Sequence, residues 1–138
     1  MRGLKRFLSL SPAERSLLLR SFCWLAVIRI GLWLFPFQTV RKIAIGARTA
    51  LNSPYSVSRV AWAVQAVSRY VPGARCLPQA LACQALLARS GHTSRLEIGV
   101  AKDEKNEFAA HAWVVCGGRI VIGESEVERY TPLAVWED

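Results

Sequence analysis

The spacing of apolar residues changes once along the chain, near Gly91, and no other feature constrains the fold as strongly. Upstream of Gly91, apolar side chains recur every three to four residues, as on one face of a helix. Downstream come three short runs of strand type, at residues 95–101, 108–115 and 119–122. Gly117-Gly118 is typical of a hairpin turn between the last two runs. The chain is therefore predicted to be α+β, with N-terminal helices packed with a small antiparallel sheet.

Four helices are predicted before the sheet. The run Ser11-Pro12-Ala13-Glu14 has the form of a capping box with proline at the first helical position, so the first helix begins at Pro12. It ends at Leu34, because a residue that precedes proline is driven out of the helical region. Three more helices are expected, at residues 40–50, 57–71 and 76–90. Residues 132–136 either add a terminal strand or pack against the sheet.

One globular unit of 138 residues is expected, with a basic, leucine-rich helical region at residues 1–52 and a core at residues 53–138. The charge is unevenly divided. Residues 1–75 hold twelve Lys and Arg against one acid, net +11, and residues 76–138 are net −3. The basic part is expected to meet an acidic partner. Nucleic acid is not expected, because no zinc-finger spacing, RNP-type aromatic run or glycine-rich phosphate loop accompanies the charge.

The apolar stretch Phe22–Phe37 is the segment best suited to contact a membrane. It is sixteen residues long and is interrupted by Arg29, whereas a spanning helix needs about twenty apolar residues. A buried helix is therefore favoured, with an interfacial helix on the membrane surface as the open alternative. The cysteines lack a CxxC pair and no secretory signal precedes them, so a cytoplasmic protein is predicted. Peripheral attachment to the inner membrane face stays open.

Cys76 is the predicted nucleophile, because it lies at the start of a predicted helix. A helix N-terminus stabilises a thiolate, since its free N–H groups and macrodipole favour an anion. The same N–H groups can hold the oxyanion of a tetrahedral intermediate. The other cysteines, Cys23, Cys83 and Cys116, are interpreted as small core residues. No metal site and no cofactor are predicted.

A cysteine nucleophile needs a base, and the chain has two histidines. His92 follows the far end of the Cys76 helix, roughly 20 Å from the thiol by helical rise, and is expected to be an exposed loop residue. His111 lies in the middle of the second strand between small residues and is the predicted base. Trp113 shares its face by strand alternation and is a candidate wall of the cleft. From these residues alone, a purely structural role for Cys76 and His111 remains open.

Three segments carry a resemblance to a known family: Cys76-Leu77-Pro78-Gln79-Ala80-Leu81-Ala82, Leu96-Glu97-Ile98-Gly99-Val100 and Ala110-His111-Ala112-Trp113-Val114. In their order and spacing they resemble the transglutaminase-like leader peptidases of lasso-peptide biosynthesis. The resemblance implies a transglutaminase- or papain-like Cys-His-Asp site, with Cys76 as nucleophile and His111 as base, that cuts the leader from a ribosomally made precursor. Trp113 and Gln79 are the candidates for substrate contact. The implied partners are the precursor's leader peptide, a small leader-recognition protein and an ATP-dependent lasso cyclase.

The third member of the site departs from the family's pattern. The resemblance places an aspartate about a dozen residues after the histidine, where this chain has Gly123. Glu124 is the candidate replacement, because an acid there would orient the imidazole. The alternative is a solvated acidic loop, with a backbone carbonyl orienting His111. Two other functions also remain open: an amidase or acyl transferase acting on a different amide, and a non-catalytic peptide-binding module of the same fold.

Overall fold

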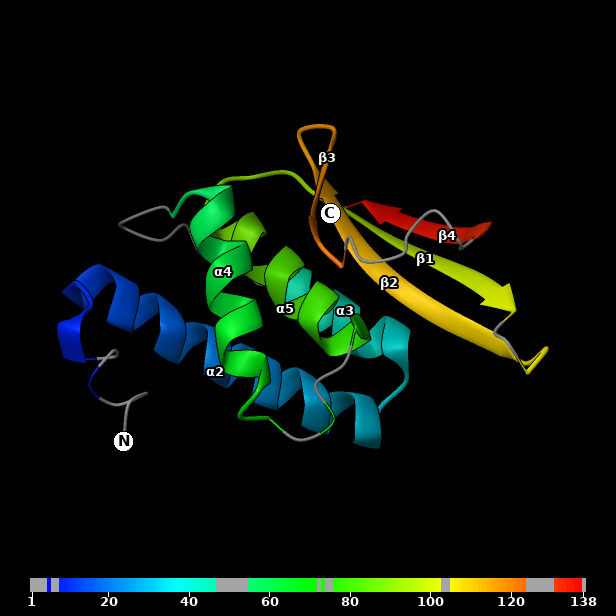
Figure 1. Ribbon diagram of the computed structural model, residues 1–138, viewed down its shortest axis with the longest axis horizontal. Helices are drawn as coiled ribbons and strands as arrows, with labels where there is room; N and C mark the ends of the chain where they lie inside the picture. Colours follow the sequence, from blue (N-terminus) through cyan, green and yellow to red (C-terminus); the bar gives the residue numbers. More distant parts are fainter. Residues whose placement is uncertain are drawn as a thin grey trace.

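Helices occupy the first two thirds of the chain and strands the rest, in a computed structural model that describes residues 5, 8–46, 55–71, 73, 76–102, 105–123 and 131–137 (Figure 1). The helices are α2 (Pro12–Leu34), α3 (Phe37–Gly46), α4 (Val57–Ser68) and α5 (Cys76–Arg89). The strands are β1 (Arg95–Lys102), β2 (Phe108–Cys116), β3 (Arg119–Ile122) and β4 (Thr131–Glu137). The predicted α+β class is confirmed.

The long helix α2 has the bounds that its capping residues predict. The hydroxyl oxygen of Ser11 accepts the backbone N–H of Glu14 at 3.2 Å, and Pro12 occupies the first turn. At the other end Phe35 is extended, as expected for a residue before proline, so the helix stops at Leu34.

The next two helices differ from prediction at one end each. α3 begins at Phe37, three residues early, because the carbonyl of Pro36 already accepts the N–H of Val40. Its predicted end at residue 50 lies outside the described residues. α4 ends at Ser68 rather than residue 71, because the following turn tightens to hydrogen bonds between residues three apart.

α5 is the central helix and lies between the other helices and the sheet (Figure 1). It packs on α2, α3 and α4 and also on β2, and it buries nine residues between Pro78 and Leu87. Gly91 adopts a φ of +83°, which lets the N–H of His92 bond back to the carbonyl of Leu87 at 2.8 Å. The predicted glycine stop is therefore confirmed.

The sheet has four strands in the order β3-β2-β1-β4, and each is antiparallel to its neighbour. β1 and β2 pair without interruption, which places Glu97 opposite Trp113. Gly117 and Gly118 both have positive φ in the hairpin turn between β2 and β3, as predicted. β4 pairs with β1, so the C-terminal segment is a strand, which the sequence left open.

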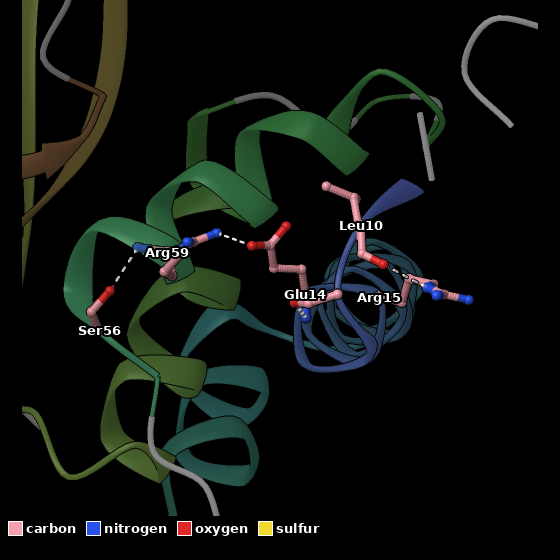
Figure 2. Close-up of polar contacts among 6 residues, drawn as sticks. Leu10, Glu14, Arg15, Ser56 and Arg59 are labelled. Carbon is pink, nitrogen blue, oxygen red and sulfur yellow. Dashed lines mark hydrogen bonds and ion pairs between the residues drawn. The ribbon is translucent and has the colours of Figure 1, made fainter. Parts of the chain in front are cut away.

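Polar contacts join α2 to α4 (Figure 2). The guanidinium of Arg59 donates to Oε1 of Glu14 at 2.5 Å, and Ser56 caps α4 by accepting the backbone N–H of Arg59. On the same helix turn, Arg15 donates to the carbonyl of Leu10 at 3.0 Å. The Arg59 side chain is 54% exposed, so the ion pair contributes at most about 1 kcal/mol to stability. Its main consequence is that the one acid among residues 1–75 faces α4.

Arg89 joins the end of α5 to both α2 and α3. Its guanidinium carbon lies 4.0 Å above the ring of Trp24, and a nitrogen donates to the carbonyl of Ala44 at 2.8 Å. Partial burial lowers the pKa of Arg89, but the side chain remains a cation at neutral pH. The contact fixes the helices on one side of α5, and the sheet covers the other.

Candidate active site

Cys76 is the first residue of α5, so its thiol lies where the backbone N–H groups of the first turn lack partners within the helix. The side chain is partly buried and packs against the hydrophobic core. Gly73, in the preceding loop, has a φ of +76°, and a Cβ there would collide with the guanidinium of Arg29 from α2. Gly73 is therefore packed directly against α2.

His111 lies in the middle of β2, and its Nε2 is 2.7 Å from the carbonyl oxygen of Gly123. A carbonyl oxygen can only accept a hydrogen bond, so Nε2 must carry the proton. In the neutral ring the lone pair is then on Nδ1. This is the tautomer that a general base requires, with one nitrogen anchored and the other basic.

Gly123 reaches this position through a backbone conformation that only glycine adopts readily. Its φ is +81°, and a Cβ would lie 2.6 Å from the carbonyl oxygen of Ala112 and 3.0 Å from Cβ of Trp113. The missing side chain lets the backbone after β3 lie close against β2 and turn its carbonyl toward His111. Glu124, the predicted third member, lies outside the described residues.

Trp113 supports the imidazole from the same face of β2. The two ring centroids are 5.8 Å apart, with the planes tilted by 32°. The indole N–H donates to Oε2 of Glu97 at 2.5 Å, and the other carboxylate oxygen accepts from Arg95 at 3.2 Å. Trp113 is 2% exposed, so it backs the histidine instead of presenting an open wall to substrate.

The two predicted catalytic side chains are carried by a packed pair of elements, α5 and β2. Ala112 and Val114 join the core that the helices form, so His111 lies on the opposite face of the strand. Among the described residues, no hydrogen bond joins Cys76 to His111. β3 pairs only with residues 114–116 of β2, so it does not flank the strand at the histidine. The structure therefore places the thiol and the imidazole on different sides of β2 and does not bring the two predicted catalytic groups together.

A family model described as the transglutaminase-like superfamily matches residues 22–135. The chain belongs to the transglutaminase-like superfamily. The match runs from within α2 to β4 and includes every residue of the site described above. Comparison of the chain with curated proteins and with solved structures gives no match in either set. The superfamily includes cysteine peptidases and acyltransferases.

The remaining thiols of this transglutaminase-like domain occupy different environments. Cys83 is fully buried in α5, as expected. Cys116 is partly exposed and donates to the carbonyl of Thr93 at 3.4 Å. Cys23 is exposed, so its prediction as a core residue is wrong. The reason is that α2 buries one narrow stripe, and Cys23 lies on the other side of the helix.

Burial raises the pKa of Cys83 from its ordinary value of 9.0 to about 12, and the nearby Cys116 adds to the shift. The unfolded chain ionises this thiol near pH 9 and the folded one does not, so rising pH favours unfolding above that value. We expect the free energy of unfolding to fall more steeply between pH 9 and pH 11 in the wild type than in Cys83→Ala. Urea titrations at several pH values measure it, and equal slopes would contradict the assignment.

Two further predicted residues are placed by the transglutaminase-like domain. His92 is partly buried, not exposed as expected, because its Nε2 lies 2.8 Å from the carbonyl of Tyr55 and ties the loop after α5 to the start of α4. Gln79 is partly exposed, one turn after Cys76 on α5. Residues three apart are neighbours on a helix surface, so its amide lies on the same side as the thiol.

Sequence reasoning missed Glu97 and Arg95, which hold Trp113. Both lie on β1 at alternate positions, so the sequence does show that they share a face. What it does not show is the register that sets Glu97 opposite Trp113. A carboxylate and an indole N–H on neighbouring strands become informative only once that register is known.

Proposed function

We propose that this transglutaminase-like chain is a cysteine peptidase that removes the leader from a ribosomally made lasso-peptide precursor. The observation that carries the proposal is the hydrogen bond from Nε2 of His111 to Gly123, because it leaves the basic lone pair on Nδ1. The position of Cys76 at the N-terminus of α5 adds an anion-stabilising site for the thiolate. The resemblance around both residues supplies the substrate class.

The proposed reaction requires a rearrangement that brings His111 from the outer face of β2 to Cys76. Nδ1 of His111 then takes the proton of the thiol, and the sulfur attacks the carbonyl carbon at the leader–core junction. The oxyanion that forms is held by the free N–H groups of the first turn of α5. Collapse breaks the C–N bond, and the leaving amine takes the proton from the imidazolium. Water then attacks the thioester, giving its proton to Nδ1, and the leader leaves as a carboxylic acid while the thiol is restored.

Gly123 has a limited part in this scheme. Its carbonyl orients the ring and fixes the tautomer, which is the role that an acid plays in related triads. A carbonyl carries only a partial negative charge, so it stabilises the imidazolium less than a carboxylate would. The adjoining Trp113 and its carboxylate partner Glu97 keep the ring from rotating away.

Two partners belong to the proposal. A leader-recognition protein presents the precursor, and an ATP-dependent cyclase consumes the released core, because ring closure needs the new amino terminus. The basic N-terminal part of the chain, net +11 over residues 1–75, offers a surface for an acidic leader or partner.

The test is to incubate the chain with a precursor peptide and a recognition protein and to weigh the products by mass spectrometry. We expect free leader with a new carboxyl terminus and free core, and less cleavage when the recognition protein is left out. Adding a primary amine distinguishes hydrolysis from acyl transfer. An acyl transferase would give leader with the amine joined to its carboxyl terminus through an amide bond. No product with any precursor, despite a folded protein, would favour the non-catalytic binding module.

A further inference from the structure

The outer side of α2 is apolar and uncovered. The helix buries one stripe of side chains, Leu17, Ser21, Leu25 and Ile28. On the opposite side lies a set of exposed apolar residues, which we name the outer face of α2: Leu19, Phe22, Val27, Ile30, Trp33 and Leu34. Trp33 is 77% exposed and Val27 is 61% exposed. A helix that is apolar all round is normally covered on all sides, so something is expected to cover this face.

The helix has the length of a membrane-spanning segment but is held within the fold. By length and composition α2 is the one helix, of those described, that could cross a membrane, because it extends ten residues upstream of the apolar run considered in the sequence. Its buried stripe, however, packs on α4 and α5, and Arg29 lies against Gly73. In the folded protein, therefore, only the outer face of α2 is open to lipid.

The charges around this face are positive. Arg15 and Arg20 line a surface groove of about 530 Å³ at one end, together with Leu19, Cys23 and Trp24. At the other end Lys42 is exposed on α3, next to Ile43, which is 68% exposed. Glu14 faces α4 and is paired with Arg59, and α3 contains no acid.

We propose that the outer face of α2 docks on an anionic lipid bilayer, with the helix lying in the plane of the interface. Apolar side chains of this kind enter the boundary between headgroups and acyl chains, and flanking Arg and Lys pair with lipid phosphates. An exposed tryptophan such as Trp33 is typical of that boundary. A second copy of the chain fits less well, because two N-terminal parts of net +11 would face each other.

The proposed orientation leaves the sheet side of the candidate active site accessible. α2 packs on helices, whereas the sheet lies on the far side of α5 (Figure 1). A bilayer against α2 therefore faces away from β2 and His111. The docking surface does not depend on the proposed peptidase function.

The experiment is cosedimentation of the full chain with vesicles of phosphatidylcholine alone or mixed with phosphatidylglycerol. We expect binding to the mixed vesicles, weakened by added salt, and little binding to phosphatidylcholine alone. The double variant Ile30→Glu with Trp33→Glu is expected to lower the affinity about tenfold or more, since two exposed apolar side chains are lost from the interface. Tyr70→Glu is the matched control, because Tyr70 is 68% exposed outside this face.

Charge reversal provides a second variant, Arg20→Glu with Lys42→Glu, which is expected to remove the preference for phosphatidylglycerol. Circular dichroism checks that each variant folds. The proposal is overturned if the wild type ignores both vesicles, or if the double variant binds as the wild type does. A third result would also overturn it: the wild type does not bind vesicles, ultracentrifugation shows that it is a dimer, and the double variant is a monomer. The face would then be an interface between two copies of the chain. None of these results changes the peptide-cleavage assay, so the two proposals fail separately.

Discussion

Replacing Cys76 with alanine is expected to lower the rate of precursor cleavage by at least about three orders of magnitude. The thioester route needs a sulfur at this position, and Cys83, the other cysteine of α5, is buried with its pKa raised to about 12. Removing the partly buried side chain leaves the helix and its core residues in place. A time course of leader release, followed by mass spectrometry, measures the loss.

Cys23→Ala is the matched control, because Cys23 is an exposed thiol on α2, away from the sheet. It is expected to cleave at the wild-type rate. His111→Ala should match the loss in Cys76→Ala, and the double variant should lose no more than either single one, since a nucleophile and its base act as a unit. Losses that multiply in the double variant would show two independent roles and would remove the basis of the proposed mechanism.

The elements that the sequence predicted best are those with signals in neighbouring residues. The capping box at Ser11 and the proline after Phe35 define α2, and Gly91 ends α5 through its own φ. α3 was misplaced because Pro36 acts as the residue before a helix there, and the same proline also ended α2. A proline that predicts the end of one helix does not by itself indicate that the next helix begins directly after it.

The parts that the sequence could not predict depend on contacts between distant residues. After β3, at one edge of the sheet, the chain crosses to the opposite edge, where β4 pairs with β1. No residue of β4 indicates this partner. The exposure of Cys23 follows from which stripe of α2 the neighbouring helices select. Both depend on tertiary packing, which the periodicity of a helix or strand in the sequence does not indicate.

The site itself divides in the same way. Cys76 at a helix start and His111 in a strand were placed by local patterns, and both elements are present as predicted. The acceptor for His111 was left open between an acid and a backbone carbonyl, because a carbonyl exists at every position and leaves no mark in the sequence. The feature that does leave a mark is Gly123, since its φ of +81° and the crowding against Ala112 require glycine.

Replacing Gly123 with alanine is expected to slow cleavage about 10- to 100-fold and to destabilise the fold by about 1–3 kcal/mol. The new Cβ would lie 2.6 Å from the carbonyl oxygen of Ala112, so the backbone must shift and withdraw its own carbonyl from Nε2 of His111. The imidazole then loses the contact that fixes its tautomer. Thermal unfolding gives the stability, and kcat with its pH profile gives the effect on the base.

Gly118→Ala is the control that separates strain from positioning. Gly118 has a φ of +77°, close to that of Gly123, but a Cβ there meets nothing within 4 Å. Gly118→Ala should therefore lower the free energy of unfolding through the same unfavourable φ, without a steric collision. It should leave kcat and its pH profile unchanged. If both variants lose stability and neither changes kcat, the carbonyl of Gly123 has no part in orienting the base.

Glu124→Gln completes the comparison, because it removes the candidate acid and leaves the residue type at Gly123 unchanged. With the carbonyl as the acceptor, this variant should cleave at the wild-type rate while Gly123→Ala does not. The reverse pattern, activity lost in Glu124→Gln and kept in Gly123→Ala, would assign the third position to the carboxylate. The two substitutions act on adjacent residues, so opposite results cannot come from a general loosening of this segment.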